Sequence, residues 1–339
     1  MTRHKSAITI KFSRLTIWKT IGVICLILST CNTPVETETI IPLPTNSAIP
    51  VIENSHIFYY GMVYPYSKNE WNEDDQPAIR ERLAYLHSLG INTVVQAFSS
   101  EMIAKGTKQD WLIFLDEAQQ VGIQVIARLY PSNEGIGREF NFQDIDEFLL
   151  LIQGHPALLA YLGLHEPLEL FDSEQLQEFY RHIKAIAPDV RVAHFIDDMA
   201  WFDANPRFPG RIFGAEICDI CIIWYYPALY KNDTFVFDME HLQEMIRANR
   251  ALVNERSSSS ELWFLGQAHS QQENMVRMPT SKEMEIIFEV TLQEEVDGFL
   301  WYAWLHDQYD QVLSDPGMEF QREAIRMIYE TYIEIMQVK

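Results

Sequence analysis

Eight short apolar segments, separated by longer stretches that mostly show helical periodicity, constrain the fold of this chain more than any other feature. The apolar segments are residues 57–63, 91–98, 123–130, 158–164, 191–196, 220–225, 261–267 and 298–304. Such alternation is typical of βα units on a parallel sheet. Eight units in about 285 residues match the usual size of a closed barrel. We therefore predict a single (β/α)8 barrel over residues 55–339.

Helical periodicity separates most of these segments. The expected helices are residues 77–89, 108–121, 142–153, 173–186, 238–254, 281–294 and 318–336. The first two end at Gly90 and Gly122, since glycine at a helix end tolerates a positive φ. The stretch with Pro206 and Pro209, after the fifth apolar segment, is expected to be irregular. An open doubly wound sheet is the alternative, disfavoured because no Gly-rich phosphate turn follows the first strand.

The N-terminal residues predict export from the cytoplasm. Basic side chains end at Lys19, and the apolar stretch that follows is typical of a signal peptide and short for a membrane span. It ends in Leu-Ser-Thr-Cys, which resembles a bacterial lipoprotein box and implies lipidation of Cys31; secretory cleavage and retention as an anchor stay open. We predict a signal peptide over residues 1–30, a Pro- and Thr-rich tether over 31–54, and membrane attachment only through this segment.

Charge and cysteine content exclude several classes of partner. The net charge of −22 repels phosphate backbones, so we predict no nucleic-acid binding. Cys218 and Cys221 form a CxxC pair, which indicates either a metal or redox site or two small apolar residues entering a buried strand. We favour the second interpretation, in which any disulfide between them is local. His194 lies within a strand and is expected in the core. No HxH or HExxH pattern occurs, so we predict no metal and no cofactor.

The expected active site lies at the carboxyl ends of the strands, as in other barrels of this type. The side chains there are polar and aromatic: Tyr64, Tyr66, Gln96, Arg128, Tyr130, His165, Glu166, Asp197, Asp198, Tyr225, Tyr226, Gln267, His269, Trp301, Tyr302, Trp304, His306 and Asp307. Aromatic faces beside hydrogen-bonding groups suit a sugar ring, which has apolar C–H faces and a rim of hydroxyls. Neighbouring side chains of a strand diverge, so at least one of Trp301 and Tyr302 faces the helices.

One motif resembles a known family. Residues 154–161 read Gly-His-Pro-Ala-Leu-Leu-Ala-Tyr and lead into His165, Glu166 and Pro167. This resembles the fourth-strand region of the clan A glycoside hydrolase superfamily, which includes β-galactosidase-like barrels. Residues 263–269, 278–280 and 298–304 are similar to the seventh- and eighth-strand regions of uncharacterised barrels of this kind. The resemblance implies that Glu166 is the general acid/base, and partial burial is expected to raise its pKa. The alternative is that Glu166 caps the following loop.

Two departures from the family pattern bear on activity. Gln267 stands where the nucleophilic Glu is expected, and a neutral amide cannot form a glycosyl ester. His165 replaces the usual Asn. One explanation is that another carboxylate serves as base or nucleophile, with Asp197 or Asp198 preferred over Asp307. The other is that the domain binds glycans without cleaving them. Asp197 and Asp198 can equally cap a loop.

The leading hypothesis is an exported O-glycosyl hydrolase of oligo- or polysaccharides, with catalytic candidates Glu166, Asp197 and Asp198. The residues expected to bind substrate are Tyr64, Gln96, Arg128, His165, Tyr225, Gln267, His269, Trp301, Trp304 and Asp307. The alternative is a non-catalytic glycan-binding or surface-scaffold barrel, which Gln267 favours.

Overall fold

The computed structural model describes residues 58–63, 76–99, 108–130, 140–231, 234–305 and 309–338. Five residues singled out above, with the predicted signal peptide and tether, lie outside the described residues. These five are Cys31, Tyr64, Tyr66, His306 and Asp307.

Eight parallel strands close into a barrel, which confirms the predicted (β/α)8 fold. The strands are β1 (Tyr59–Val63), β2 (Thr93–Ser99), β3 (Gln124–Tyr130), β4 (Leu158–His165), β5 (Arg191–Phe195), β6 (Ile220–Trp224), β9 (Glu261–Gln267) and β11 (Gly298–Tyr302). Their order around the barrel is β1-β11-β9-β6-β5-β4-β3-β2, so chain neighbours pair and β11 closes on β1. Every bound lies within two residues of its prediction, the usual scatter of strand ends.

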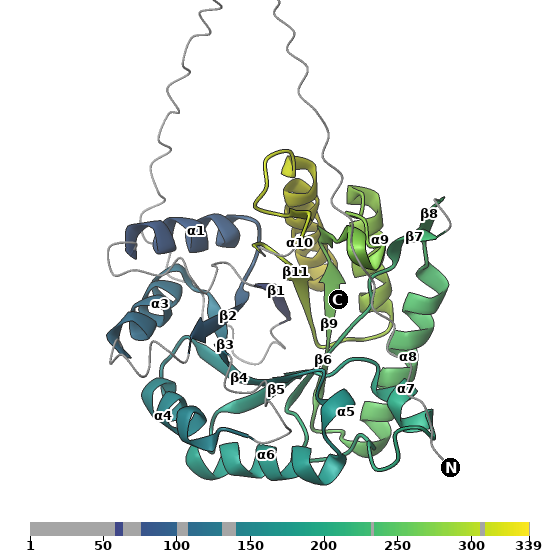
Figure 1. Ribbon diagram of the computed structural model, residues 1–339. Helices are drawn as coiled ribbons and strands as arrows, with labels where there is room; N and C mark the ends of the chain where they lie inside the picture. Colours follow the sequence, from purple (N-terminus) through teal and green to yellow (C-terminus); the bar gives the residue numbers. More distant parts are fainter. Residues whose placement is uncertain are drawn as a thin grey trace, which may run out of the picture. The chain divides into compact units, whose positions relative to one another are not determined.

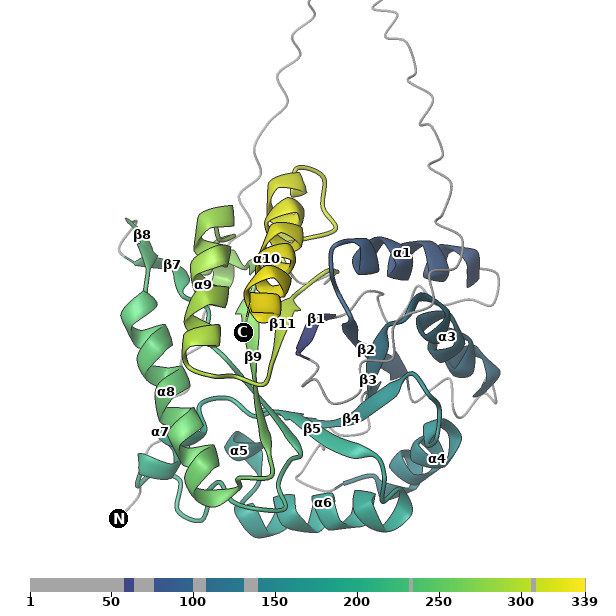
Figure 2. The same ribbon diagram turned by 180° about the vertical axis from the view of Figure 1, so that it is seen from behind.

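Helices surround the barrel on its outside (Figures 1 and 2). They are α1 (Gln76–Ser88), α3 (Lys108–Val121), α4 (Phe142–Ile152), α6 (Ser173–Ile186), α8 (Met239–Arg256), α9 (Ser281–Gln293) and α10 (Glu319–Val338). Gly90 and Gly122 follow α1 and α3 with φ of 87° and 79°, as predicted for helix-ending glycines. Capping boxes begin α6 and α9, where Asp172 and Thr280 accept hydrogen bonds from backbone N–H groups.

Short elements that the sequence did not predict lie in the loops after β4, β5, β6, β9 and β11. They are α5 (Pro167–Leu170), α7 (Met199–Ala204), the hairpin of β7 (Ala228–Lys231) and β8 (Thr234–Phe237), the 3-10 turn η2 (Gln272–Asn274), and the pair β10 (His269–Ser270) and β12 (Gln311–Val312). Elements of two to six residues carry too little periodicity to be recognised in a sequence. They build the carboxyl-terminal side of the barrel, where the active site is expected.

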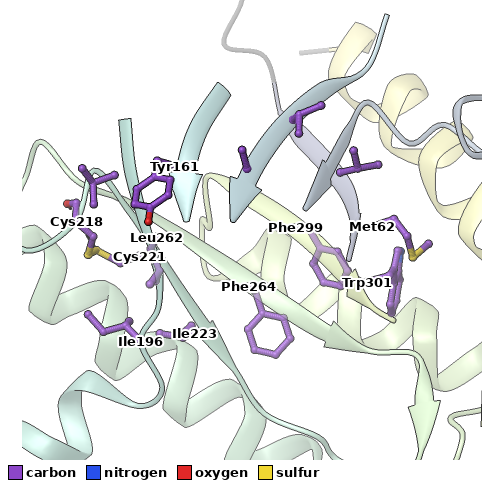
Figure 3. Close-up of a cluster of buried hydrophobic side chains, with 14 of the residues drawn as sticks. Met62, Tyr161, Ile196, Cys218, Cys221, Ile223, Leu262, Phe264, Phe299 and Trp301 are labelled. Carbon is purple, nitrogen blue, oxygen red and sulfur yellow. Dashed lines mark hydrogen bonds between the residues drawn. A yellow bond between two sulfur atoms is a disulfide. The ribbon is translucent and has the colours of Figure 1, made fainter. Parts of the chain in front are cut away.

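Alternation along the strands divides the core into an inner and an outer cluster. Val95, Ile126, Leu162, Ile222 and their counterparts fill the barrel, whereas the residues between them pack outward against the helices. Figure 3 shows part of the outer cluster.

Aromatic and charged side chains fill the amino-terminal end of the barrel. Tyr59 stacks on Trp263 with ring centroids 5.0 Å apart, and the Trp263 indole N–H donates to Glu261 over 2.9 Å. Glu261 in turn pairs with Arg191 at 2.7 Å. These contacts satisfy the polar groups of Trp263, Glu261 and Arg191 at this end of the barrel.

Cys218 and Cys221 are both buried in the outer cluster, as favoured, and they form a local disulfide with Cα atoms 5.6 Å apart (Figure 3). Across the described residues, no three His, Cys, Asp or Glu side chains are grouped so that they hold a metal ion. Within the same part of the chain, no helix has both the length and the apolar character needed to cross a membrane.

Candidate active site

The carboxyl end of β4 is irregular, and His194 supports it. Pairing between β4 and β5 shifts register between Leu162 and His165. His194, fully buried on β5, accepts a hydrogen bond at Nδ1 from the Leu164 N–H over 2.9 Å. Burial lowers the pKa of His194 to about 3, so the ring is neutral and Nδ1 keeps its lone pair. Gly163 is required here, because a Cβ at this position would lie 2.6 Å from Cε1 of His194.

Two acidic residues follow neighbouring strands in a left-handed backbone conformation. Glu166 comes directly after β4 with φ 50°, and Asp197 follows β5 with φ 59°. The Glu166 N–H donates to the Phe195 carbonyl over 2.8 Å, which joins the two strand ends. Non-glycine residues in this region cost about 1–3 kcal/mol each and concentrate at functional sites. This side of the barrel therefore carries backbone strain next to acidic side chains.

The environment of Glu166 favours its protonated form. Burial raises its pKa to about 6, and the charges of Glu169 and Asp197 contribute in the same direction. Glu166 precedes α5, but its side chain makes no capping hydrogen bond, so the loop-cap interpretation of Glu166 is wrong. At pH 7 a carboxyl group with a pKa near 6 is protonated in about a tenth of the molecules, compared with less than about 1% for the ordinary value of 4.5, and this favours a role as general acid.

Asp197 and Asp198 have different roles. Burial raises the pKa of Asp197, as do the charges of Asp198 and Glu169, whereas a hydrogen bond from the Asp198 N–H lowers it. Asp198 Oδ1 accepts from the Trp201 N–H over 3.1 Å and from Asn249 Nδ2 over 2.9 Å. Asp198 is thus the N-cap of α7, which bears out its loop-cap interpretation. Asp197 remains the candidate second carboxylate.

Arg128 and His165, both predicted to bind substrate, lie on the inner face of neighbouring strands. Arg128 alternates with Ala127 and Leu129 of the outer cluster and is almost fully buried. His165 lies parallel to Trp224, with centroids 5.7 Å apart and an interplanar angle of 5°. Enclosure by the barrel mouth, with the charge of Arg128, lowers the pKa of His165 to about 4. His165 is therefore a neutral donor and acceptor above about pH 5.

Aromatic side chains form the opposite side of the mouth. Tyr226 and Tyr302 lie nearly parallel, with centroids 6.4 Å apart and an angle of 16°, and the Tyr309 hydroxyl donates to that of Tyr302 over 3.2 Å. His269 stacks on Tyr309 at 4.4 Å, and its Nδ1 lies 3.0 Å from the Tyr302 carbonyl. His269 is fully buried among these rings. The prediction that His269 contacts substrate is therefore wrong. The residue instead supports the tyrosines.

Gln267 is a structural residue rather than a substrate ligand. It is fully buried, and its Oε1 accepts from the Ala228 N–H over 2.9 Å. Its Nε2 donates to the carbonyls of Ala228, His269 and Arg277. Because the side chain both donates and accepts, an amide fits this position and a carboxylate does not. The predicted contact between Gln267 and substrate is therefore corrected.

Two predicted ligands of the last strand region face the helices. The Trp301 indole N–H donates to the Tyr60 hydroxyl over 2.7 Å, and Tyr60 donates to the Ile325 carbonyl of α10 over 3.0 Å. Figure 3 shows Trp301 with Met62 and Phe299 in the outer cluster. Trp304 also belongs to the outer cluster and contacts Tyr85 of α1, with centroids 5.7 Å apart. The predicted divergence of Trp301 and Tyr302 is confirmed, and Tyr302 is the inward member.

The predictions that Gln96 and Tyr225 bind substrate are also wrong, because both side chains face the helices. Gln96 lies between Val94 and Phe98, which pack outward, and its Nε2 donates to the Ala97 carbonyl over 2.8 Å. The Tyr225 ring contacts His241 of α8 at 4.7 Å, and burial with the carboxylate of Asp238 raises its pKa to about 12. Strand alternation places both side chains against the helices instead of in the mouth.

Three aromatic residues of the mouth were missed from the sequence. Phe195 and Trp224 continue the inward alternation of Ala193 and Ile222, so strict application of the two-residue period would have found them. Tyr309 lies in a loop and carries no such signal.

Comparisons with known proteins bear on the fold. No protein-family model and no curated protein matches the sequence. The solved structures with a similar fold include glycoside hydrolases. A β-galactosidase from the psychrophilic Marinomonas ef1 is 11% identical with a TM-score of 0.60, over 83% of this chain and 60% of that one. GH5_18 from Streptomyces cattleya, in complex with GlcNAc, is 15% identical with a TM-score of 0.56, over 83% and 81% of the two chains.

A third similar structure is the GH99 endo-α-mannosidase from Bacteriodes thetaiotaomicron, which is 9% identical with a TM-score of 0.57, over 80% and 86% of the two chains. At these identities the likeness establishes the eight-stranded parallel barrel that the resemblance implied.

Proposed function

We propose that this barrel is a carbohydrate-active enzyme that hydrolyses O-glycosidic bonds. The observation that carries the proposal is Glu166, half-buried at the end of β4, with a pKa raised to about 6 by burial and by the nearby charges of Glu169 and Asp197. The aromatic side chains Trp224, Tyr226 and Tyr302 provide faces for a sugar ring. The fold shared with glycoside hydrolases supports the same conclusion.

In the proposed reaction, the Glu166 carboxyl donates its proton to the glycosidic oxygen as the bond to the anomeric carbon breaks. The carboxylate of Asp197 stabilises the positive charge that develops on the sugar. Water then adds to the anomeric carbon, and its proton returns to a carboxylate of the site. Arg128 and neutral His165 bind the sugar hydroxyls, because one donates only and the other both donates and accepts.

We also propose that the protein acts outside the cytoplasm, with Cys31 as a lipid anchor or residues 1–30 as a cleaved signal. The signal-like N-terminus supports this location. The Cys218–Cys221 disulfide is consistent with an oxidising compartment.

The test combines binding and product analysis. The protein is incubated with oligosaccharides of β-1,4-mannan, β-1,4-galactan, chitin and α-mannan, and products are separated by chromatography. Glu166→Gln is expected to lower hydrolysis by about 10²–10⁴-fold, the usual contribution of a general acid, and Asp197→Asn is expected to lower it as well. Glu178→Gln, at an exposed position of α6, is the matched control. Unchanged turnover in Glu166→Gln contradicts the proposal.

A second candidate is a glycan-binding barrel without catalysis. It is favoured by Gln267, whose amide is engaged by main chain where a retaining clan A enzyme would place its nucleophile. Saccharide binding measured by calorimetry, with no product from any oligosaccharide, would decide for this candidate.

A further inference from the structure

A second groove lies beside the mouth, on loops that follow β6, β9 and β11. Its volume is about 950 Å³, within the range of ligand sites in proteins. It is lined by Tyr230, Ser270, Gln272, Met275, Val276, Arg277, Met278, Asp310 and Gln311. One border is formed by the β7–β8 hairpin, which projects beside α8 and α9 (Figure 1).

Exposed aromatic side chains border this groove. Tyr230 and Phe235 face each other across the hairpin, with ring centroids 5.0 Å apart. Phe235 is 67% exposed and Met275 is 59% exposed, which is unusual for large apolar side chains of one small region. Amide, hydroxyl and carboxylate groups of Gln272, Ser270 and Asp310 lie in the same lining. This mixture of ring faces and hydrogen-bonding groups repeats the chemistry of the mouth.

The groove is held in shape by main-chain contacts that converge on Gln267. The Tyr230 N–H donates to the Met275 carbonyl over 2.7 Å, and the Arg277 N–H donates to the Ala228 carbonyl over 3.1 Å. Gln267 binds the main chain of both Ala228 and Arg277 from below. A groove fixed before binding loses little conformational entropy when a ligand enters.

Residues of the groove are chain neighbours of residues of the mouth. Ser270 follows His269, and Asp310 follows Tyr309, so the residues that line the groove adjoin those of the aromatic side of the mouth. The pairing of β10 with β12 joins these two segments, and the Gln272 N–H donates to the Asp310 carboxylate. The groove and the aromatic side of the mouth are therefore built on the same two loop segments.

We propose that this groove binds further sugar residues of a neutral oligo- or polysaccharide whose reacting residue occupies the mouth. The proposal rests on the proposed function and makes the substrate an extended glycan rather than a mono- or disaccharide. A neutral ligand fits because the charge of Arg277 is compensated by Glu283, to which its guanidinium donates over 2.7 Å. The other charged side chain of the lining, Asp310, and the net charge of −22 disfavour an anionic ligand.

The test measures how affinity depends on chain length. Glu166→Gln protein is titrated by calorimetry with the disaccharide and the hexasaccharide of whichever panel polysaccharide the protein binds best. The hexasaccharide is expected to bind about tenfold more tightly than the disaccharide. Phe235→Ala, added to this background, is expected to remove about two- to tenfold of that gain and to leave disaccharide binding unchanged, since an aromatic contact contributes about 0.5–1.5 kcal/mol.

Phe320→Ala, in which an exposed phenylalanine outside the groove is removed, is the matched control. Side-chain amide signals of Gln272 and Gln311 in NMR spectra are expected to shift with the hexasaccharide only. Equal affinity for both lengths, or a gain that Phe235→Ala leaves intact, overturns the inference while the proposed function stands. Absence of binding by every saccharide overturns the proposed function itself.

Discussion

The two sides of the barrel mouth differ in what their polar side chains do. On the β4–β5 side, Glu166 and Asp197 have left-handed backbones and raised pKa values, and the Glu166 side chain makes no capping hydrogen bond. On the β9–β11 side, Gln267 is fully bonded to main chain and His269 is buried among tyrosines.

The difference separates reactive from supporting chemistry. A group that transfers a proton needs a perturbed pKa and an accessible atom, and both are costly to keep in a folded protein. A group that holds loops needs its hydrogen bonds satisfied. In this barrel Gln267 is a group of the second kind, whereas Glu166 and Asp197, which follow neighbouring strands, are the groups with raised pKa values.

The largest expected effect on stability comes from Gln267→Glu, which puts an ionisable carboxyl group in place of an amide that holds loops. The carboxylate would face three carbonyls to which Gln267 donates, so we expect the free energy of unfolding at pH 8 to fall by about 3 kcal/mol or more, as when a buried partner is lost. Denaturant unfolding measures this, with Gln153→Glu, at an exposed position, as the control. A loss under about 1 kcal/mol, or a gain of hydrolytic activity, would contradict the structural role of Gln267.

The second largest expected effect on stability comes from replacing His194, which supports the end of β4 before Glu166. His194→Phe leaves the Leu164 N–H without its acceptor, so we expect a loss of about 2 kcal/mol in unfolding free energy. His194→Gln retains an acceptor and should lose less. If the proposed role of Glu166 is right, His194→Phe also lowers turnover at the pH optimum while His194→Gln restores part of it. Equal behaviour of the two variants would show that the hydrogen bond is unimportant.

The smallest effect is a pH-dependent gain in stability from Glu166→Gln. The folded-state pKa of about 6 lies above the ordinary value of 4.5, so the folded protein binds this proton more tightly than the unfolded chain. Stability therefore falls as pH rises from 4.5 through 6 and stays lower above it. The variant cannot ionise, so we expect it to be more stable than the native protein by about 1 kcal/mol at pH 8, a value reduced for solvent screening.

At pH 4 the native protein and Glu166→Gln are expected to unfold at the same denaturant concentration, with Glu178→Gln as the control for the exchange itself. A difference in unfolding free energy that does not depend on pH would mean that ionisation of Glu166 does not destabilise the folded state.

Most of the fold was predictable, whereas the direction of individual side chains was not. Glu166 and His165 lie at the carboxyl end of β4 and Arg128 lies two residues before the end of β3, so their position near the mouth could be predicted from the strand bounds. Gln96, Tyr225, Trp301 and Trp304 were placed incorrectly, since proximity to a strand end does not say which face a side chain takes. The two-residue alternation of side chains gives the direction of Gln96, Tyr225 and Trp301 once the register of each strand is known.

The sequence by itself determined the eight βα units, because apolar segments of strand length and amphipathic helices are local patterns that must be buried together. Tertiary structure alone decided which acids meet. Glu166 and Asp197 are 31 positions apart, and only the pairing of β4 with β5 brings the Asp197 charge close enough to add to the effect of burial, which raises the pKa of Glu166. Likewise, the hydrogen bonds of Gln267 to loops 39 and 10 residues away exist only once the barrel has closed.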